Sequence, residues 1–180
     1  MQPVSRMTSN LGKGYSTHNA LLLRVLDASE GDVVEMGSGP FSTALLHWYC
    51  KNKKRKLVTY EDDPQYYVFC KEFQSPEHRI VFIENWDDVD TSKHKGVVFI
   101  DHGGKLNEGF HGSRRGLDVT RWKDTADYIV MHDTEVGDYV KEDIYNYKPM
   151  WEHFKYKFTW KECRPWASVV SNSKDVSGWI

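Results

Sequence analysis

The sequence predicts an α/β fold: a doubly wound, mostly parallel sheet with helices on both faces and an antiparallel hairpin at its C-terminal end. Short apolar runs alternate with amphipathic stretches along most of the chain, as in units of strand, helix and strand. The first such run, at residues 32–36, ends in a glycine turn that leads directly into a helical pattern. Two strand-like segments near the C-terminus, 155–162 and 166–171, favour the hairpin.

Length, charge and cysteine content restrict the possible classes of protein. The 180 residues predict a single domain over the whole chain, with residues 1–14 as a flexible lead-in. A formal net charge of −2 argues against general nucleic-acid binding. No apolar run is long enough to span a bilayer, so no membrane partner is expected. The 3 cysteines (Cys50, Cys70 and Cys163) are widely spaced and are expected to be reduced core thiols in a cytoplasmic protein.

The segment before the first strand is predicted to form a helix that covers one face of the sheet. Its apolar positions 21, 22, 25 and 26 share one side of a helix, and Ser16 or Thr17 is a suitable N-cap. After the first strand, Gly37 and Gly39 permit positive φ and leave no Cβ between the chain and a ligand. Pro40 suits the first position of a helix over 41–49, where its missing N–H would have no partner.

Four further apolar runs predict strands, at 57–60, 78–83, 96–100 and 127–131. The run 96–100 is the most continuous, which is typical of a strand buried on both faces and placed next to the first strand. Asp62 and Asp63 precede Pro64 and are expected to cap a helix over 65–73. The basic run 51–56 is expected to be a solvated loop, and a last helix is predicted over 136–148.

The glycine turn is the first candidate binding site, because parallel sheets bind nucleotides where such a turn joins a strand to a helix N-terminus. A dinucleotide fingerprint requires a third glycine where this chain has Ser42, and no lysine of a Walker loop follows. The remaining pattern, Glu35-Met36-Gly37-Ser38-Gly39, resembles the E/D-x-G-x-G motif of class I S-adenosylmethionine (SAM) dependent methyltransferases. SAM is cationic at sulfur and carries no phosphate, so a carboxylate before the glycines is tolerable for SAM and would repel a phosphate.

This resemblance covers roughly residues 15–171 and implies a Rossmann-like sheet and a SAM site. Glu35, Gly37, Ser38 and Gly39 would approach the methionine portion of the cofactor. Glu61, about twenty residues beyond the glycine turn, would accept both ribose hydroxyls. Asn85 and Trp86 would flank the adenine. Asp62 and Asp101 complete the expected cofactor-binding set.

A second chemical centre is expected where the fourth and fifth strands end in Asp101-His102 and His132-Asp133-Thr134-Glu135. Neighbouring parallel strands deliver these groups to one cleft. Asp101 and Asp133 match the aspartates of metal-dependent O-methyltransferases, so Mg²⁺ is one expectation, although the Asp-Asn pair of many such sites is missing. The other expectation is a metal-free general base, His102 or His132.

The sequence therefore predicts a SAM-dependent methyltransferase acting on a hydroxyl of a small molecule or sugar. His132, Asp133, His102 and Asp101 would face the transfer site, with Arg114, Arg115 and Glu135 toward the substrate. The fourth strand is not followed by Asn-Pro-Pro-Tyr, the signature of amino methylation, which favours oxygen as the acceptor atom. Two alternatives stay open: a nucleotide or nucleotide-sugar enzyme doing metal-assisted transfer or hydrolysis, and a noncatalytic SAM-fold binding subunit.

Overall fold

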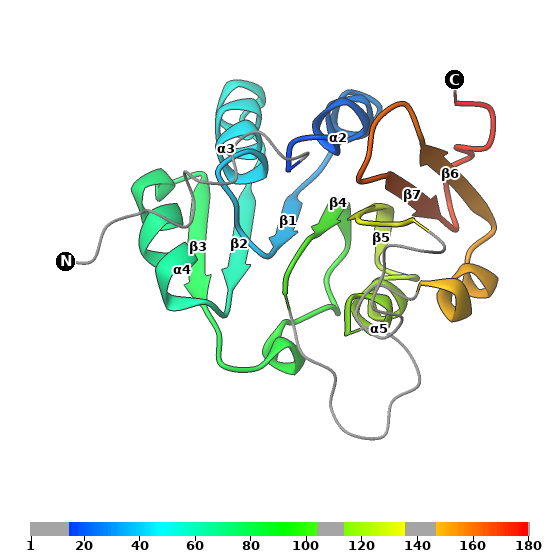
Figure 1. Cartoon of the computed structure of the whole chain (residues 1–180). Coiled ribbons are helices and arrows are strands. Elements are labelled where there is room, and N and C mark those ends of the chain that lie inside the picture. Colours follow the sequence, from blue (N-terminus) through cyan, green and yellow to red (C-terminus); the bar gives the residue numbers. More distant parts are fainter. Residues whose placement is uncertain (1–14, 104–113, 136–146, 180) are drawn as a thin grey trace.

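The computed structural model describes residues 15–103, 114–135 and 147–179, which form one seven-stranded sheet of order β3-β2-β1-β4-β5-β7-β6 (Figure 1). The strands are β1 (Val33–Met36), β2 (Leu57–Glu61), β3 (His78–Phe82), β4 (Lys95–Ile100), β5 (Ala126–His132), β6 (Tyr156–Trp160) and β7 (Ala167–Ser171). Strands β1 to β5 run parallel to one another, whereas β7 is antiparallel to both of its neighbours, β5 and β6. The predicted doubly wound sheet and C-terminal hairpin are confirmed.

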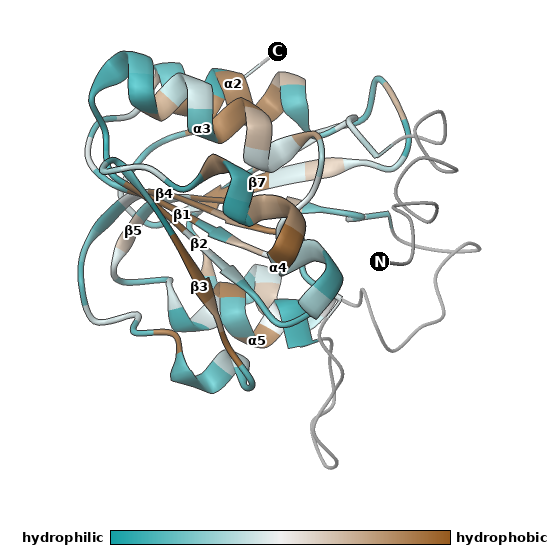
Figure 2. Ribbon diagram, turned by 90° about the vertical axis from the view of Figure 1, so that its left-hand side faces the viewer, coloured by the Kyte–Doolittle hydropathy of each residue, from teal (hydrophilic) through white to brown (hydrophobic). Residues whose placement is uncertain are grey.

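Helices cover both faces of this sheet. They are α2 (Asn19–Asp27), α3 (Ser42–Lys53), α4 (Pro64–Cys70) and α5 (Arg114–Arg121), with 3₁₀ turns η1 (Lys71–Phe73), η2 (Trp86–Asp88) and η3 (Lys148–His153). Figure 2 shows α2 and α3 above the sheet and α5 below it, so that the apolar strands lie between two helical layers. Each layer closes its own apolar cluster against the sheet.

The two-residue period of the strands decides which side chain faces which layer. In β1, Val33 packs in the cluster under α2 and α3, while Val34 and Met36 pack in the cluster above α5. In β5, Val130 belongs to the first cluster and Met131 to the second. The same alternation continues into the polar residues at the strand ends, and it sorts the candidate site residues between the two layers.

Three local predictions are wrong and one is right. Helix α2 has His18 as its N-cap residue, without a side-chain cap, because the Thr17 hydroxyl donates to the carbonyl of Pro165 instead. Helix α3 starts beyond Pro40, at Ser42, and it continues through Lys53, into the basic run expected to be a loop. Asp63 caps α4 as predicted, accepting hydrogen bonds from two backbone amides of the first turn.

The cysteine prediction holds for two of three residues: Cys50 and Cys70 are buried, but Cys163 is exposed. Within the described ranges, none of the helices combines the length and apolar character needed to cross a bilayer. The helix predicted over 136–148 falls almost entirely outside the described residues, which resume just before η3.

Candidate functional site

A cleft of about 1010 Å³ opens at the carboxyl ends of β1, β2, β4 and β5. It lies where the chain order reverses between β1 and β4, the usual ligand position in an open α/β sheet. Its volume is at the upper end of the range typical of small-molecule sites. The glycine turn lines one side, and Asp101, His102, His132 and Asp133 line the other.

The glycine turn is held close to the end of β4. Gly37 has φ +90°, and a Cβ there would lie 2.5 Å from the backbone nitrogen and Cα of His102. Only glycine allows this approach, which brings the two halves of the site together. Gly39 has room for a Cβ, and its amide donates to the Thr43 hydroxyl at 2.9 Å. The protein itself therefore requires glycine at position 37 but not at 39.

Glu61 is the last residue of β2 and lines the cleft, and the sequence predicts that it binds the ribose of SAM. Its Oε2 accepts from the amide and the hydroxyl of Ser38, each at 2.6 Å. Its Oε1 accepts from the amides of Asp62 and Asp63 at 3.0 and 2.9 Å. A carboxylate has about four acceptor positions, so the protein's own donors already fill those of Glu61. A ribose hydroxyl has to replace one of them, and the Ser38 hydroxyl is the donor that a rotation can move away.

Glu35 does not reach the cleft. Its position on β1 turns it under α3, where it is fully buried. Its carboxylate accepts from Thr59 at 2.7 Å and from Thr43 at 3.0 Å. Burial, which these hydrogen bonds only partly offset, raises the pKa of Glu35 to about 7. Because Thr43 also holds the amide of Gly39, Glu35 supports the glycine turn from behind.

The residues expected at the adenine line the cleft, but their side chains have protein partners. Asn85 accepts from the amide of Asp87 at 3.0 Å and so begins η2. Trp86 is buried, stacks on the His102 ring with centroids 4.1 Å apart, and donates to Asp62 at 2.9 Å. Trp86 therefore braces the wall of the cleft, and His102 already occupies one face of its ring.

Arg115 of α5 joins the ends of β4 and β5. Its guanidinium lies 3.0 Å from Asp101 Oδ1 and 2.9 Å from Asp133 Oδ2, and it also donates to the backbone carbonyls of Asp101 and His102. Burial works against ionisation of Asp101, but Arg115 and His132 outweigh it and hold its pKa at about 2. The expected Mg²⁺ pair of Asp101 and Asp133 receives no support, because this guanidinium bridges the two carboxylates.

His132 points to the α2 side of the strand ends. The register that pairs Ile100 with Met131 places the next residues, Asp101 and His132, side by side. His132 Nδ1 lies 3.3 Å from Asp101 Oδ2, and its Nε2 lies 2.9 Å from the Thr17 hydroxyl. Burial lowers the pKa of His132, but Asp101 more than compensates and leaves it above the ordinary value.

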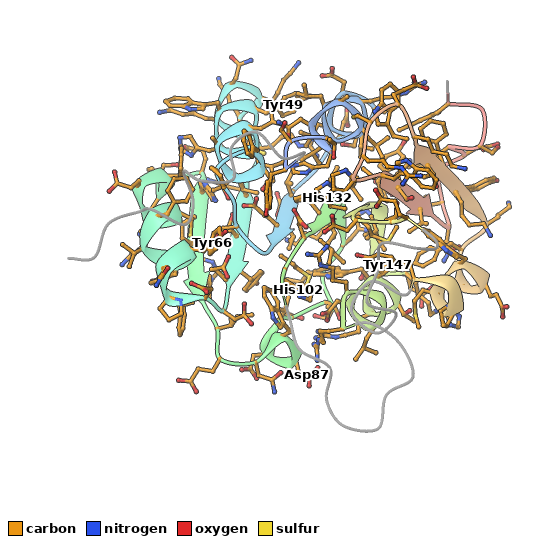
Figure 3. The ribbon with its side chains drawn as sticks, viewed as in Figure 1. Tyr49, Tyr66, Asp87, His102, His132 and Tyr147 are labelled. Carbon is orange, nitrogen blue, oxygen red and sulfur yellow. The ribbon has the colours of Figure 1, made fainter. Side chains whose placement is uncertain are left out.

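His102 points to the opposite side, toward α5, as Figure 3 shows for the two labelled histidines. Its Nε2 lies 3.0 Å from Oδ2 of Asp118, a fully buried carboxylate that also pairs with Arg114 and Arg121. Burial lowers the pKa of His102 further than Asp118 restores it. Arg114, expected to hold an anionic substrate, is instead committed to Asp118 and Asp87.

Three residues in or beside the site were missed by sequence reasoning: His18, Thr17 and Asp118. His18 is 2% exposed, packs against the rings of Phe99 and His132, and lines the cleft. Burial lowers the pKa of His18 to about 4, so the imidazole is neutral near pH 7. The sequence did indicate that position 18 is buried, since it lies one helical turn before Leu22 on the apolar side of α2.

Of the remaining candidates, Glu135 is only half-buried and does not line the cleft.

No protein-family model and no curated protein matches this chain. Solved structures do match. The N-terminal domain of human METTL16 in complex with SAH has a TM-score of 0.57 at 11% identity, over 97% of this chain and 73% of that one. Precorrin-6y C5,15-methyltransferase from Geobacter metallireducens GS-15 gives 0.57 at 14% identity, over 84% and 86% of the two chains. A methyltransferase from Pyrococcus furiosus gives 0.55 at 15%, over 86% and 83%.

These likenesses agree with the sheet order and with the motif in the first glycine turn. The chain has the class I SAM-dependent methyltransferase fold, as the sequence predicts.

Proposed function

We propose that this protein is a SAM-dependent methyltransferase that methylates a hydroxyl oxygen of a small molecule or sugar. The observation that carries the proposal is the cleft at the switch point between β1 and β4, with the glycine turn and Glu61 on one side and Asp101 and His132 on the other. SAM would lie along the glycine turn, and the acceptor would lie against the ends of β4 and β5.

The charge of the cleft supports SAM over a phosphate-bearing cofactor. Acidic side chains dominate its lining: Glu61, Asp62, Asp63, Glu84, Asp101 and Asp133. The arginines that line it, Arg114 and Arg115, are engaged by aspartates. Such a surface attracts a sulfonium and repels the phosphates of NAD or ATP. Two of the matching structures were solved with SAH bound, which supports the same cofactor.

Methyl transfer to a hydroxyl needs an in-line approach and loss of one proton. The acceptor oxygen forms a bond to the methyl carbon, the bond from carbon to sulfur breaks, and S-adenosylhomocysteine leaves. The hydroxyl proton would leave beside His132 and Asp101, because these two titratable side chains line the cleft and are paired with each other. Most of the remaining catalysis is positioning of the two substrates.

A cytoplasmic location remains a prediction from the three free cysteines.

Calorimetric titration with SAM, and in parallel with NAD and ATP, tests the cofactor. We expect micromolar SAM binding and none for the other two. If the folded protein binds NAD or ATP but not SAM, it is a nucleotide enzyme and the proposal fails. If it binds SAM but transfers no methyl group to any hydroxyl acceptor in a broad panel, the noncatalytic binding subunit replaces the enzyme.

A further inference from the structure

We infer that His18, Asp101 and His132 form a site for one late first-row divalent cation of the Zn²⁺ class in the wall of the cleft. One ligand atom from each residue lies within 4.8 Å of the other two. Two imidazoles and one carboxylate are a donor set that such cations favour, and three protein ligands leave a coordination position for water or substrate. The site shares only Asp101 with the Mg²⁺ pair that the sequence suggested.

The surroundings of His18 are the strongest support for this cation site. His18 is 2% exposed, and neither of its ring nitrogens has a hydrogen-bond partner among the described residues. A buried imidazole nitrogen without a partner is costly and requires an explanation. The three residues line the cleft together, so the unpartnered imidazole lies beside the carboxylate and the second imidazole. A cation bound by all three would use this otherwise unused donor.

The hydrogen bonds of Thr17 point the same way. Thr17 has one hydroxyl proton, and it donates that proton to the Pro165 carbonyl at 2.5 Å. It must therefore accept from His132, which places the N–H of that ring on Nε2. Nδ1 of the neutral ring then presents a lone pair to Asp101 Oδ2, 3.3 Å away.

Two acceptors that face each other need a positive centre between them, either a proton or a metal ion. A proton shared by His132 and Asp101 would leave His18 without a role, whereas a metal ion takes a ligand from all three. The remaining atoms are arranged for it: Arg115 pairs with the other oxygen of Asp101, and Thr17 orients the His132 ring from behind.

The use of the cation rests on the proposed methyl transfer. An acceptor hydroxyl bound at the open position would lose its proton to water more readily, because the cation stabilises the alkoxide. The alkoxide oxygen would then take the methyl group, and the electron pair of the breaking bond would go to sulfur. The cation supplies charge only, and no electron is gained or lost.

The test is Zn²⁺ binding by metal-depleted protein, measured by competition with a chromophoric chelator. We expect one Zn²⁺ per chain for the wild type, no competition by Mg²⁺, and at least tenfold weaker binding for His18→Phe, which keeps a ring against Phe99. His94→Phe is the matched control, because His94 is 64% exposed and lies just before Lys95, at the amino-terminal end of β4 and away from the cleft. Equal Zn²⁺ affinity in wild type and His18→Phe would overturn the inference.

Two further measurements keep the result unambiguous. Co²⁺ in the wild type should give the strong visible absorption of a four- or five-coordinate ion, and the weak spectrum of a hydrated ion would overturn the site without any variant. SAM titration of the same samples separates this inference from the proposed function. Zn²⁺ binding without SAM binding would keep the site and refute the methyltransferase, and SAM binding without Zn²⁺ binding would do the reverse.

Discussion

Carboxylates lie on both sides of the switch point, but their surroundings are opposite. On the side of β1 and β2, burial raises the pKa of Glu35 and Glu61, whose partners are hydroxyl groups and backbone amides. On the side of β4 and α5, burial also works against ionisation of Asp101 and Asp118, but neighbouring cationic groups prevail and the pKa of each is lowered. The difference comes from the arginines of α5 together with His132 and His102, which pair with carboxylates only on the second side.

This difference separates two tasks. A buried carboxyl group that no cation faces has a raised pKa, so its uncharged form persists to higher pH. Such a group can serve as a structural hydrogen-bond acceptor, as Glu35 does behind the glycine turn. An ion-paired carboxylate keeps its charge and can pair with a cationic group, as Asp101 does with Arg115.

Arg115→Ala should have the largest effect, a loss of about 3–5 kcal/mol in the free energy of unfolding, because it leaves Asp101 and Asp133 without their shared cation. Urea denaturation of wild type and variant measures it. Arg79→Ala, on the exposed side of β3, is the control and should stay within about 0.5 kcal/mol of wild type. A loss below about 1 kcal/mol for Arg115→Ala would show that the pairing of Arg115 with the two aspartates does not stabilise the fold.

His132→Gln should lower the rate of methyl transfer by a factor of at least about 100, because it removes the titratable partner of Asp101 at the transfer site. His102→Gln is the matched comparison. It should affect mainly stability, since His102 is held by Asp118 and Trp86 on the other side of the strand ends. Turnover of the acceptor that the wild type methylates is the measurement, and equal losses in the two variants would refute the separation of roles.

Glu35 should make stability depend on pH. Its pKa rises from 4.5 to about 7 on folding, so the folded state holds its proton more tightly. The stabilisation is complete below pH 4.5 and is lost as the pH rises to about 7. Glu35→Gln should remove this pH dependence. Its free energy of unfolding relative to that of the wild type should therefore rise by about 2–3 kcal/mol from pH 5 to pH 8. Urea denaturation at both values measures the gain.

The control for this prediction is Glu72→Gln, an exposed side chain in η1. It should follow the wild type at both pH values. If Glu35→Gln follows the wild type as well, Glu35 is ionised in the folded protein and the contrast between the two sides of the cleft fails.

Most of the fold could be predicted from the sequence, because apolar strands and amphipathic helices leave periodic patterns. The run at 96–100 is buried on both faces, and β4 indeed lies beside β1. The orientation of Glu35 was also within reach, since the period of two puts it on the same face as Val33. The resemblance to the motif led instead to the expectation that it approaches the cofactor.

The partners of the charged residues were not predictable in the same way. Arg114 and Arg115 are adjacent in sequence, yet Arg114 turns to Asp118 within its own helix while Arg115 reaches the ends of two strands. No pattern in a single sequence distinguishes these from exposed arginines, because burial of a long cationic side chain depends on which carboxylates the fold brings near it. His18 was missed for the same reason, as its neighbours come from β4 and β5.

The smallest predicted effect concerns Ser38, whose hydroxyl donates to the Glu61 oxygen at 2.6 Å. If ribose replaces this donor, Ser38→Ala removes a competitor and should tighten SAM binding by a few-fold, because one acceptor position of Glu61 is vacated in advance. Glu61→Gln should instead weaken binding by about tenfold, since it removes the charge that strengthens both ribose hydrogen bonds. Calorimetric titration compares the two, with denaturation curves to verify that the turn is intact. If Ser38→Ala weakens binding as much as Glu61→Gln does, the Ser38 hydroxyl contacts SAM itself, and the carboxylate of Glu61 serves the glycine turn in the way that Glu35 does.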